Sequence, residues 1–250
     1  MHVFTIANLR GGEGKTITAL VLANFLRELE YRVLFIDLDS QCNATDKFNI
    51  ETNNINTVYD VLKYREMPIE NAIQHGKFGD IIAGDCKLGA FNIYFEPIDY
   101  RYVNHLSKAL KTISDKYDFV VIDTSPIDTF SIYVGLTAAN SVIIPASFGM
   151  HWAYILKEIS NLILDTKDVF NPQLEVDGIL ITKYDEDYSE MQEVEKQYFE
   201  IASKYDIDIF KTRIHNFLNL RQDFRQVFKY DYVNFCMELL EKHNWFTGEN

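Results

Sequence analysis

The chain has 250 residues, of which 47% are hydrophobic, 14% aromatic and 24% charged. This composition excludes an intrinsically disordered protein and is sufficient for one sizeable core, so we expect a single domain over residues 1–250. The 24 basic and 37 acidic residues give a formal net charge of −13. Such a charge repels polyanions, so binding to nucleic acid or to an anionic membrane would need a local basic patch.

The cysteines and the apolar runs indicate the compartment. The chain has three cysteines, Cys42, Cys86 and Cys236, which form neither a CxxC pair nor an even disulfide framework. This pattern favours a reducing compartment, and we expect a cytoplasmic protein. No apolar run approaches the roughly 18 residues of a membrane span. The apolar residues 1–8 are too short for a signal sequence and are interpreted as a strand.

Strand-length and helix-length patterns alternate along the chain. Apolar runs typical of strands buried on both faces occur at 3–7, 33–36, 119–122, 142–144 and 179–181. Apolar residues recur three and four apart, as in amphipathic helices, at 17–29, 103–113, 153–164 and 191–205. A short helix at 58–64, a strand at 80–83 and a terminal helix at about 230–243 are also expected. This order predicts an α/β fold with a doubly wound, mostly parallel sheet.

A glycine-rich loop follows the first predicted strand and precedes the first predicted helix. Its backbone N–H groups and the helix N-terminus suit phosphate oxygens, Lys15 suits the β and γ phosphates, and Thr16 suits Mg²⁺. Leu9 stands where the usual P-loop has glycine, so we expect a variant loop; the alternative is an ordinary glycine-rich turn. The predicted nucleotide-binding residues are Gly11, Gly12, Glu13, Gly14, Lys15, Thr16 and Ile17.

Three acidic residues follow two other predicted strands. Asp37 and Asp39 come after the run 33–36, and Asp123 follows the run 119–122 in the form of a Walker B strand. The carboxyl ends of parallel strands are where ligands bind in open α/β sheets. Each aspartate alone could be a turn or capping residue. Together with Lys15 and Thr16 they predict a Mg²⁺–nucleotide site, with Asp37 or Asp39 orienting the attacking water.

These motifs resemble those of the ParA/MinD family of deviant Walker A ATPases, and the ParA branch in particular. The family loop KGGxGKT is similar to residues 10–16, its DxDPQxN motif to residues 37–43, and its IDxPP motif to residues 122–126. Segments 142–145, 178–182 and 210–212 also resemble ParA segments at similar spacing. The resemblance covers most of the chain.

The resemblance implies a function and a site. It implies an α/β P-loop ATPase that binds MgATP, forms a homodimer around it, and hydrolyses it slowly to ADP and phosphate until a ParB-like adaptor accelerates the reaction. Lys15 would then be the P-loop lysine, Asp39 would orient the attacking water, and the metal residues would be Thr16, Asp37 and Asp123. The implied role is chromosome or plasmid partition through non-specific DNA binding, with a nucleoid-associated location.

The chain departs from the family pattern at several positions. Family members have a signature lysine where Arg10 stands, and we expect Arg10 to act across the dimer much like an arginine finger. Serine replaces proline at Ser40 and Ser125. The segment 214–216 reads IHN where ParA proteins tend to read IPRN, a departure at the place of the family's adenine-edge contact. Asn216 of this segment is also predicted to bind the nucleotide.

A basic stripe lies near the end of the chain. The segment from 211 to 229 contains five basic residues and one acidic residue, Asp223. If the segment is helical, three of them share one face and could contact DNA phosphates; the alternative is an ordinary solvated surface. The predicted DNA-binding residues are Lys211, Arg213, Arg221, Arg225 and Lys229.

Other functions remain open at this stage. A MinD-like protein would bind membranes through the tail 230–246, but that tail has no cationic face, so a helix packed on the core and no stable membrane association are expected. An amidating ligase of related fold would need a second-substrate pocket. An iron–sulfur carrier would need Cys42 and Cys86 as ligands across a dimer. A cargo-positioning ATPase that does not use DNA, or a nucleotide switch that does not hydrolyse ATP, also fits the motifs.

Overall fold

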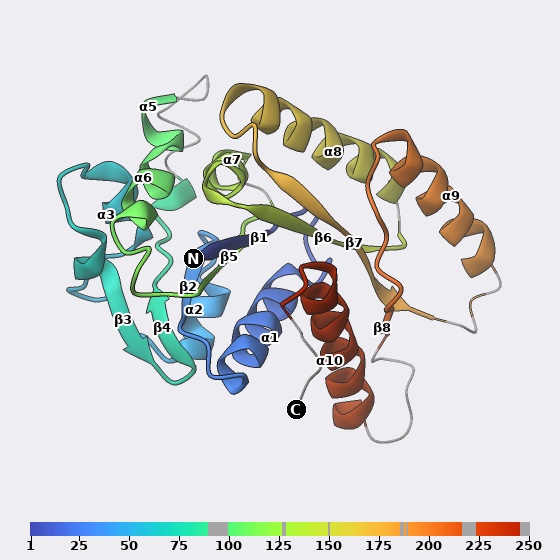
Figure 1. Ribbon diagram of the computed structural model, residues 1–250, viewed down its shortest axis with the longest axis horizontal. Helices are drawn as coiled ribbons and strands as arrows, with labels where there is room; N and C mark the ends of the chain where they lie inside the picture. The colour runs from blue at the N-terminus through green and yellow to red at the C-terminus, as the bar shows by residue number, and fades with distance from the viewer. Residues whose placement is uncertain are drawn as a thin grey trace.

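The computed structural model describes residues 1–89, 100–126, 129–149, 151–185, 188, 190–216 and 224–245, without the side chains of 100–101, 192 and 224–229. Its described strands form one eight-stranded sheet in the order β3-β4-β2-β5-β1-β6-β7-β8 (Figure 1). All neighbouring strands are parallel except β3 and β4. The predicted doubly wound, mostly parallel sheet is therefore confirmed.

The strands correspond closely to the buried apolar runs. The apolar runs predict five of them, with β1 (His2–Ile6) shifted by one residue and the other four longer than predicted: β2 (Val33–Leu38), β5 (Phe119–Thr124), β6 (Ser141–Ser147) and β7 (Glu175–Tyr184). The predicted strand at 80–83 is β4 (Gly79–Ile82). The sequence pattern missed β3 (Ile73–Gly76) and β8 (Ile214–His215), which are short and only partly apolar.

Helices cover both faces of the sheet. One face carries α1 (Lys15–Glu28), α2 (Asn43–Phe48) and α10 (Phe224–Lys242). The other carries α3 (Val58–Lys63), η1 (Ile69–Ala72), α6 (His105–Lys111), α7 (Thr129–Ala138), α8 (Trp152–Val169) and α9 (Met191–Lys204). Figure 1 shows α1 and α10 side by side beneath the sheet and α7 and α8 above it. Successive residues of each central strand therefore enter opposite cores.

Two helical predictions need correction. The helix expected at 103–113 is split at Asn104 into α5 (Tyr100–Val103) and α6. The terminal helix begins at Phe224 rather than about residue 230, because nothing between 224 and 230 is a glycine or proline that would stop it. Its Phe235, Leu239 and Leu240 are fully buried, which confirms that this helix packs on the core.

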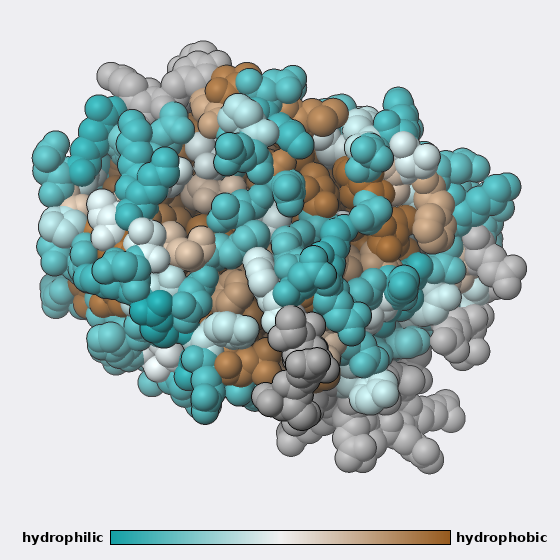
Figure 2. Space-filling view, viewed as in Figure 1, coloured by the Kyte–Doolittle hydropathy of each residue, from teal (hydrophilic) through white to brown (hydrophobic). Residues whose placement is uncertain are grey.

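The surface in view is mostly hydrophilic. Figure 2 shows hydrophilic residues over most of the face in view, with hydrophobic side chains visible only between them. Within the described part of the chain, no helix is both long enough and apolar enough to cross a membrane.

Candidate functional site

The glycine loop lies between β1 and α1, at the carboxyl edge of the parallel strands. Gly12 has φ +80° and Gly14 has φ +89°, a left-handed conformation that residues with a Cβ rarely adopt. Gly14 is the N-cap of α1 and brings no side-chain cap. The first N–H groups of this 14-residue helix are consequently left for a ligand, as in phosphate-binding loops.

Lys15 is held inside this loop. Its Nζ donates a hydrogen bond to the Arg10 carbonyl oxygen at 2.8 Å. Burial lowers the pKa of Lys15, and the carboxylates of Asp123, Asp39 and Glu13 oppose that shift. A buried ammonium among acidic groups, placed at the helix N-terminus, is well suited to neutralise a phosphate.

The motif at residues 37–43 is held by hydrogen bonds to its two aspartates. The Asp37 carboxylate accepts hydrogen bonds from the backbone N–H of Asp39 at 3.0 Å and from Thr45, through its N–H at 2.9 Å and its hydroxyl at 2.7 Å. Asp39 in turn accepts from the N–H of Gln41 at 3.0 Å. Burial raises the pKa of Asp37 to about 6, and the Thr45 hydrogen bonds oppose that shift.

Asp123 has very different surroundings. Its strand β5 lies between β1 and β2, with Asp123 beside Ile6 on one side and Asp37 on the other. The side chain is fully buried, and neither carboxylate oxygen forms a hydrogen bond of good geometry within the described part of the chain. Burial, and then Asp37, raise the pKa of Asp123, whereas Thr16 and Lys15 lie close enough to oppose the rise.

A buried carboxylate that lacks a hydrogen bond of good geometry in the described chain, and that lies beside Thr16 and Lys15, fits a divalent cation bridging to a phosphate. Mg²⁺ prefers such oxygen ligands and keeps several waters, so one carboxylate and one hydroxyl suffice on the protein side. Among the residues the structure describes, no group of three or more His, Cys, Asp or Glu side chains could hold a metal ion alone. The donor set therefore suits a metal that arrives with a nucleotide.

Arg10 and Glu13 form an ion pair within the loop. The Arg10 Nε lies 3.2 Å from Glu13 Oε1, and Glu13 also accepts a hydrogen bond from the Ser147 backbone N–H. The sequence pattern placed both residues in the loop, but it gave no sign that they pair with each other. Both side chains lie against the end of β6 and the segment after it, where Glu13 contacts Ser147 and Arg10 approaches Gly149.

Asn216 follows β8 and donates its backbone N–H to the Tyr184 carbonyl oxygen at 2.8 Å. It thus lies at the same edge as the glycine loop, on the far side of β6 and β7. In the preceding position His215 contacts Asp231 of α10 at 2.9 Å through Nδ1. The departure from the family's proline therefore anchors β8 to α10.

The basic stripe is only partly described. Arg221 lies outside the described residues, and Arg225 and Lys229 belong to α10 with undescribed side chains. Arg213 pairs with Glu195 at 2.8 Å, and Glu238 accepts hydrogen bonds from the N–H groups of Lys211 and Thr212. Acidic residues from α9 and α10 thus reduce the positive charge at the described end of the basic stripe.

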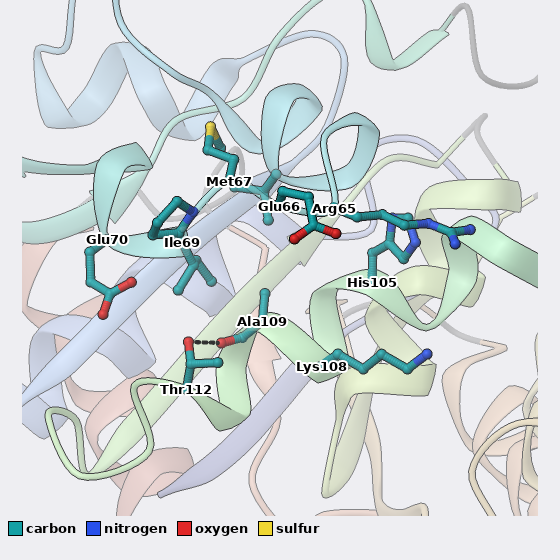
Figure 3. Close-up of a pocket in the computed structure, with 11 residues that line it drawn as sticks. Arg65, Glu66, Met67, Ile69, Glu70, His105, Lys108, Ala109 and Thr112 are labelled. Carbon is teal, nitrogen blue, oxygen red and sulfur yellow. Dashed lines mark hydrogen bonds between the residues drawn. The ribbon is translucent and has the colours of Figure 1, made fainter.

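A pocket of the described chain lies away from these motifs. It has a volume of about 720 Å³ and is formed by the end of α3, η1 and α6, at the β3–β4 end of the sheet. Arg65, His105 and Lys108 lie toward one end and Glu70 toward the other (Figure 3). No residue of the glycine loop or of the two acidic motifs lines it.

The cysteines do not form a cluster site. All three are free thiols, with Cys236 buried, Cys42 half-buried and Cys86 exposed. Burial, with the nearby Asp37 and Asp85, raises the pKa of Cys42 to about 12.

The parallel sheet and the glycine loop define a P-loop nucleotide-binding domain of the α/β class. The sequence model of the AAA domain family matches residues 1–176. ParA of Caulobacter vibrioides is 32% identical over 200 residues, 78% of this chain and 74% of that protein. Soj of Bacillus subtilis, a sporulation initiation inhibitor protein, is 30% identical over 192 residues, 73% of each chain. The chain belongs to the ParA/Soj family of chromosome partitioning proteins.

Solved structures agree with this assignment. A plasmid partition protein from Borrelia burgdorferi is 26% identical, with a TM-score of 0.76 over 96% of this chain and 98% of that one. Cobyrinic acid a,c-diamide synthase from Mycobacterium smegmatis, solved with ADP and magnesium, has a TM-score of 0.81 at 23% identity, covering 100% of this chain and 97% of that one. The second similarity concerns the fold alone.

Proposed function

We propose that this protein is a cytoplasmic ATPase that binds MgATP, dimerises around it, and hydrolyses it slowly during plasmid or chromosome segregation. The observation that carries the proposal is the buried Asp123 carboxylate, which lies beside Lys15 and Thr16 and has no hydrogen bond of good geometry in the described part of the chain. Leaving such a group without a partner is costly, so its presence favours a ligand that brings a cation to it.

Each residue then has a chemical task. Bound Mg²⁺ would neutralise phosphate charge, with Thr16 as its protein ligand and Asp123 holding its water shell. Lys15 would stabilise the negative charge that builds on the phosphates, and the N–H groups of the loop would hold their oxygens. Asp39 would orient the attacking water. The hydrogen bonds on Asp37 favour a supporting role for that residue, in which it shapes the loop that carries Asp39.

The family membership supports nucleotide-dependent self-association, and we propose a homodimer with ATP. Two weak basic patches brought together by dimerisation would bind DNA more strongly than one. Hydrolysis would end the dimer and would therefore release the DNA. Arg221, Arg225 and Lys229 are the proposed phosphate contacts, with Lys211 and Arg213 at the margin. A ParB-like adaptor would accelerate hydrolysis, and its basic segment would suit the acidic surface.

A second candidate is a cargo-positioning ATPase that does not use DNA. The pairing of Arg213 with Glu195, together with Glu238 beside Lys211, favours it, because these acids weaken the basic stripe where it is described.

Fluorescence anisotropy with a non-specific duplex separates the two candidates. The protein is measured without nucleotide, with ADP and with ATP, as wild type and as Arg221→Glu/Arg225→Glu. The matched control is Lys157→Glu/Lys167→Glu, which makes the same charge change at exposed positions of α8. The DNA-binding candidate is supported if the protein binds the duplex only with ATP and the affinity falls steeply with salt. The first variant should then lose this binding, and the control variant should keep it. ATP binding without DNA binding in any state supports the second candidate.

A further inference from the structure

Glu13 is a buried carboxylate that faces away from the phosphate side of its loop. Its side chain is only 3% exposed and lines a small cavity with Asn8, Arg10, Ser147, Trp152 and Tyr198. A buried charge is stable only when it is paired and hydrogen-bonded. The Ser147 N–H supplies the hydrogen bond and Arg10 supplies the opposite charge.

Arg10 is drawn back toward this carboxylate. Its guanidinium packs closely on Gly149, in the segment after β6, where an added Cβ would lie 2.5 and 2.6 Å from the two terminal nitrogens. Only 30% of the side chain is exposed. In this position Arg10 is paired within its own chain.

The pairing leaves Arg10 incompletely satisfied. Its Nη1 is buried and has no hydrogen-bond partner in the described part of the chain. An unsatisfied buried donor is costly, and a guanidinium is best satisfied by a bidentate anion such as a phosphate. Departure of Arg10 would in turn remove the charge partner of Glu13. Arg10 beside Glu13 leaves a buried donor unsatisfied, and Arg10 away from Glu13 leaves a buried carboxylate without this charge partner. Each position of Arg10 therefore has an energetic cost, as a two-state switch requires.

We propose that Glu13 is a positioning residue that holds Arg10 within its own chain, and that ATP-dependent dimerisation requires Arg10 to leave Glu13 for the nucleotide phosphates bound by a second copy. This inference rests on the proposed dimerising function. Glu13 then determines how strongly the monomer opposes dimerisation. This role gives a reason for an arginine and a buried acid to occur together in the loop.

Two variants release Arg10 by different means. Glu13→Gln keeps an acceptor for the Ser147 N–H and removes the negative charge. Gly149→Ala leaves Glu13 intact and places a methyl group where the guanidinium lies, and Gly149 is not among the glycines with positive φ. Thermal unfolding first establishes that both variants fold.

The test measures the monomer–dimer dissociation constant by sedimentation with MgATP, in an Asp39→Ala background that suppresses hydrolysis. Both variants are expected to dimerise at least about tenfold more tightly than the background protein, because neither of the two copies then has to give up a charge-assisted contact on dimerising. Arg10→Ala is expected to weaken dimerisation, and adding Glu13→Gln to Arg10→Ala is expected to change nothing further.

The outcomes separate the two proposals. If the background protein dimerises and Glu13→Gln leaves the constant unchanged or weakens it, Glu13 does not hold Arg10 back. Tightening by Glu13→Gln in the Arg10→Ala background would also overturn the inference, because Glu13 would then act independently of Arg10. If neither the background protein nor any variant dimerises while each binds MgATP, the dimerising function itself fails. Dimerisation of Glu13→Gln alone would support the inference most strongly.

Discussion

Asp37 and Asp123 are register partners on the neighbouring parallel strands β2 and β5, yet one carboxylate is fully hydrogen-bonded and the other has no partner of good geometry in the described chain. Two adjacent buried acids of similar sequence context thus have different surroundings. The hydrogen bonds of Asp37 hold the loop that leads into α2. Asp123 is the carboxylate that we propose for a cation beside Lys15 and Thr16.

Replacing Asp123 with asparagine should abolish stabilisation by MgATP without destabilising the free protein. Burial raises the pKa of Asp123, so the carboxyl group favours folding only at low pH, and this contribution is lost as pH rises through the raised pKa. The variant should therefore gain stability relative to wild type as pH increases. Thermal unfolding at pH 5 to 8, with and without MgATP, measures both effects. A less stable free variant that still responds to MgATP would contradict this role.

Thr45 links Asp37 to the segment that follows β4. Its hydroxyl donates to Asp37 and accepts from the Gly84 N–H at 2.8 Å. Thr45→Val removes both hydrogen bonds from a buried site and should lower the free energy of unfolding by about 2–3 kcal/mol. Thr45→Ser keeps the hydroxyl and should cost less than about 1 kcal/mol. Urea unfolding checks the difference, and equal losses in the two variants would show that the hydroxyl is unimportant.

Asp39→Ala should separate ATP binding from hydrolysis. Asp39 is nearly buried at the carboxyl edge of β2 and contacts the N–H of Gln41. Loss of a group that positions the attacking water typically lowers turnover by about 100-fold or more, while the loop and Lys15 still bind the nucleotide. Phosphate release and nucleotide affinity are the two measurements. Unchanged turnover would move the water-orienting role to another residue.

His2 should make the fold sensitive to mild acid. Its Nε2 lies 3.0 Å from the Ser141 hydroxyl. Burial, then His243, lower the pKa of His2 from 6.5 to about 4, and Asp177 opposes the shift. The folded protein therefore resists protonation of His2, so this stabilising contribution is complete above pH 6.5 and is lost as pH falls toward 4.

The loss attributed to His2 amounts to at most about 3 kcal/mol. His2→Gln should flatten the dependence of the unfolding free energy on pH between 6.5 and 4. His75→Gln, at an exposed histidine, serves as the control. Urea unfolding across this range measures the slope, and an unchanged slope in His2→Gln would show that other groups cause the acid sensitivity.

Much of the fold could be predicted from the sequence because the central strands are buried on both faces. Continuous apolar runs mark β1, β2, β5, β6 and β7. Helix α7 was missed because its residues are apolar on every side: it is buried from Phe130 to Thr137 with one half-buried exception, so it has no amphipathic period. The short strands β3 and β8 carry too few apolar residues to be recognised.

The candidate site was predictable in its location but not in its internal contacts. Motif spacing placed Lys15, Thr16 and the three aspartates at one edge, because parallel strands end together. It could not distinguish Asp37 from Asp123, since the difference depends on Thr45, which is contributed by α2. The pairing of Arg10 with Glu13 also depends on Ser147, far along the chain.

The central claim is that ATP binding at the glycine loop drives self-association, and sedimentation velocity of the Asp39→Ala protein tests it most directly. The protein is measured with MgATP, with MgADP and without nucleotide, alongside Asp39→Ala/Lys15→Ala. A dimer only with MgATP, and none in the doubly substituted protein, is the expected result. A monomer in every condition despite measured ATP binding, or a dimer that ignores nucleotide, would contradict it.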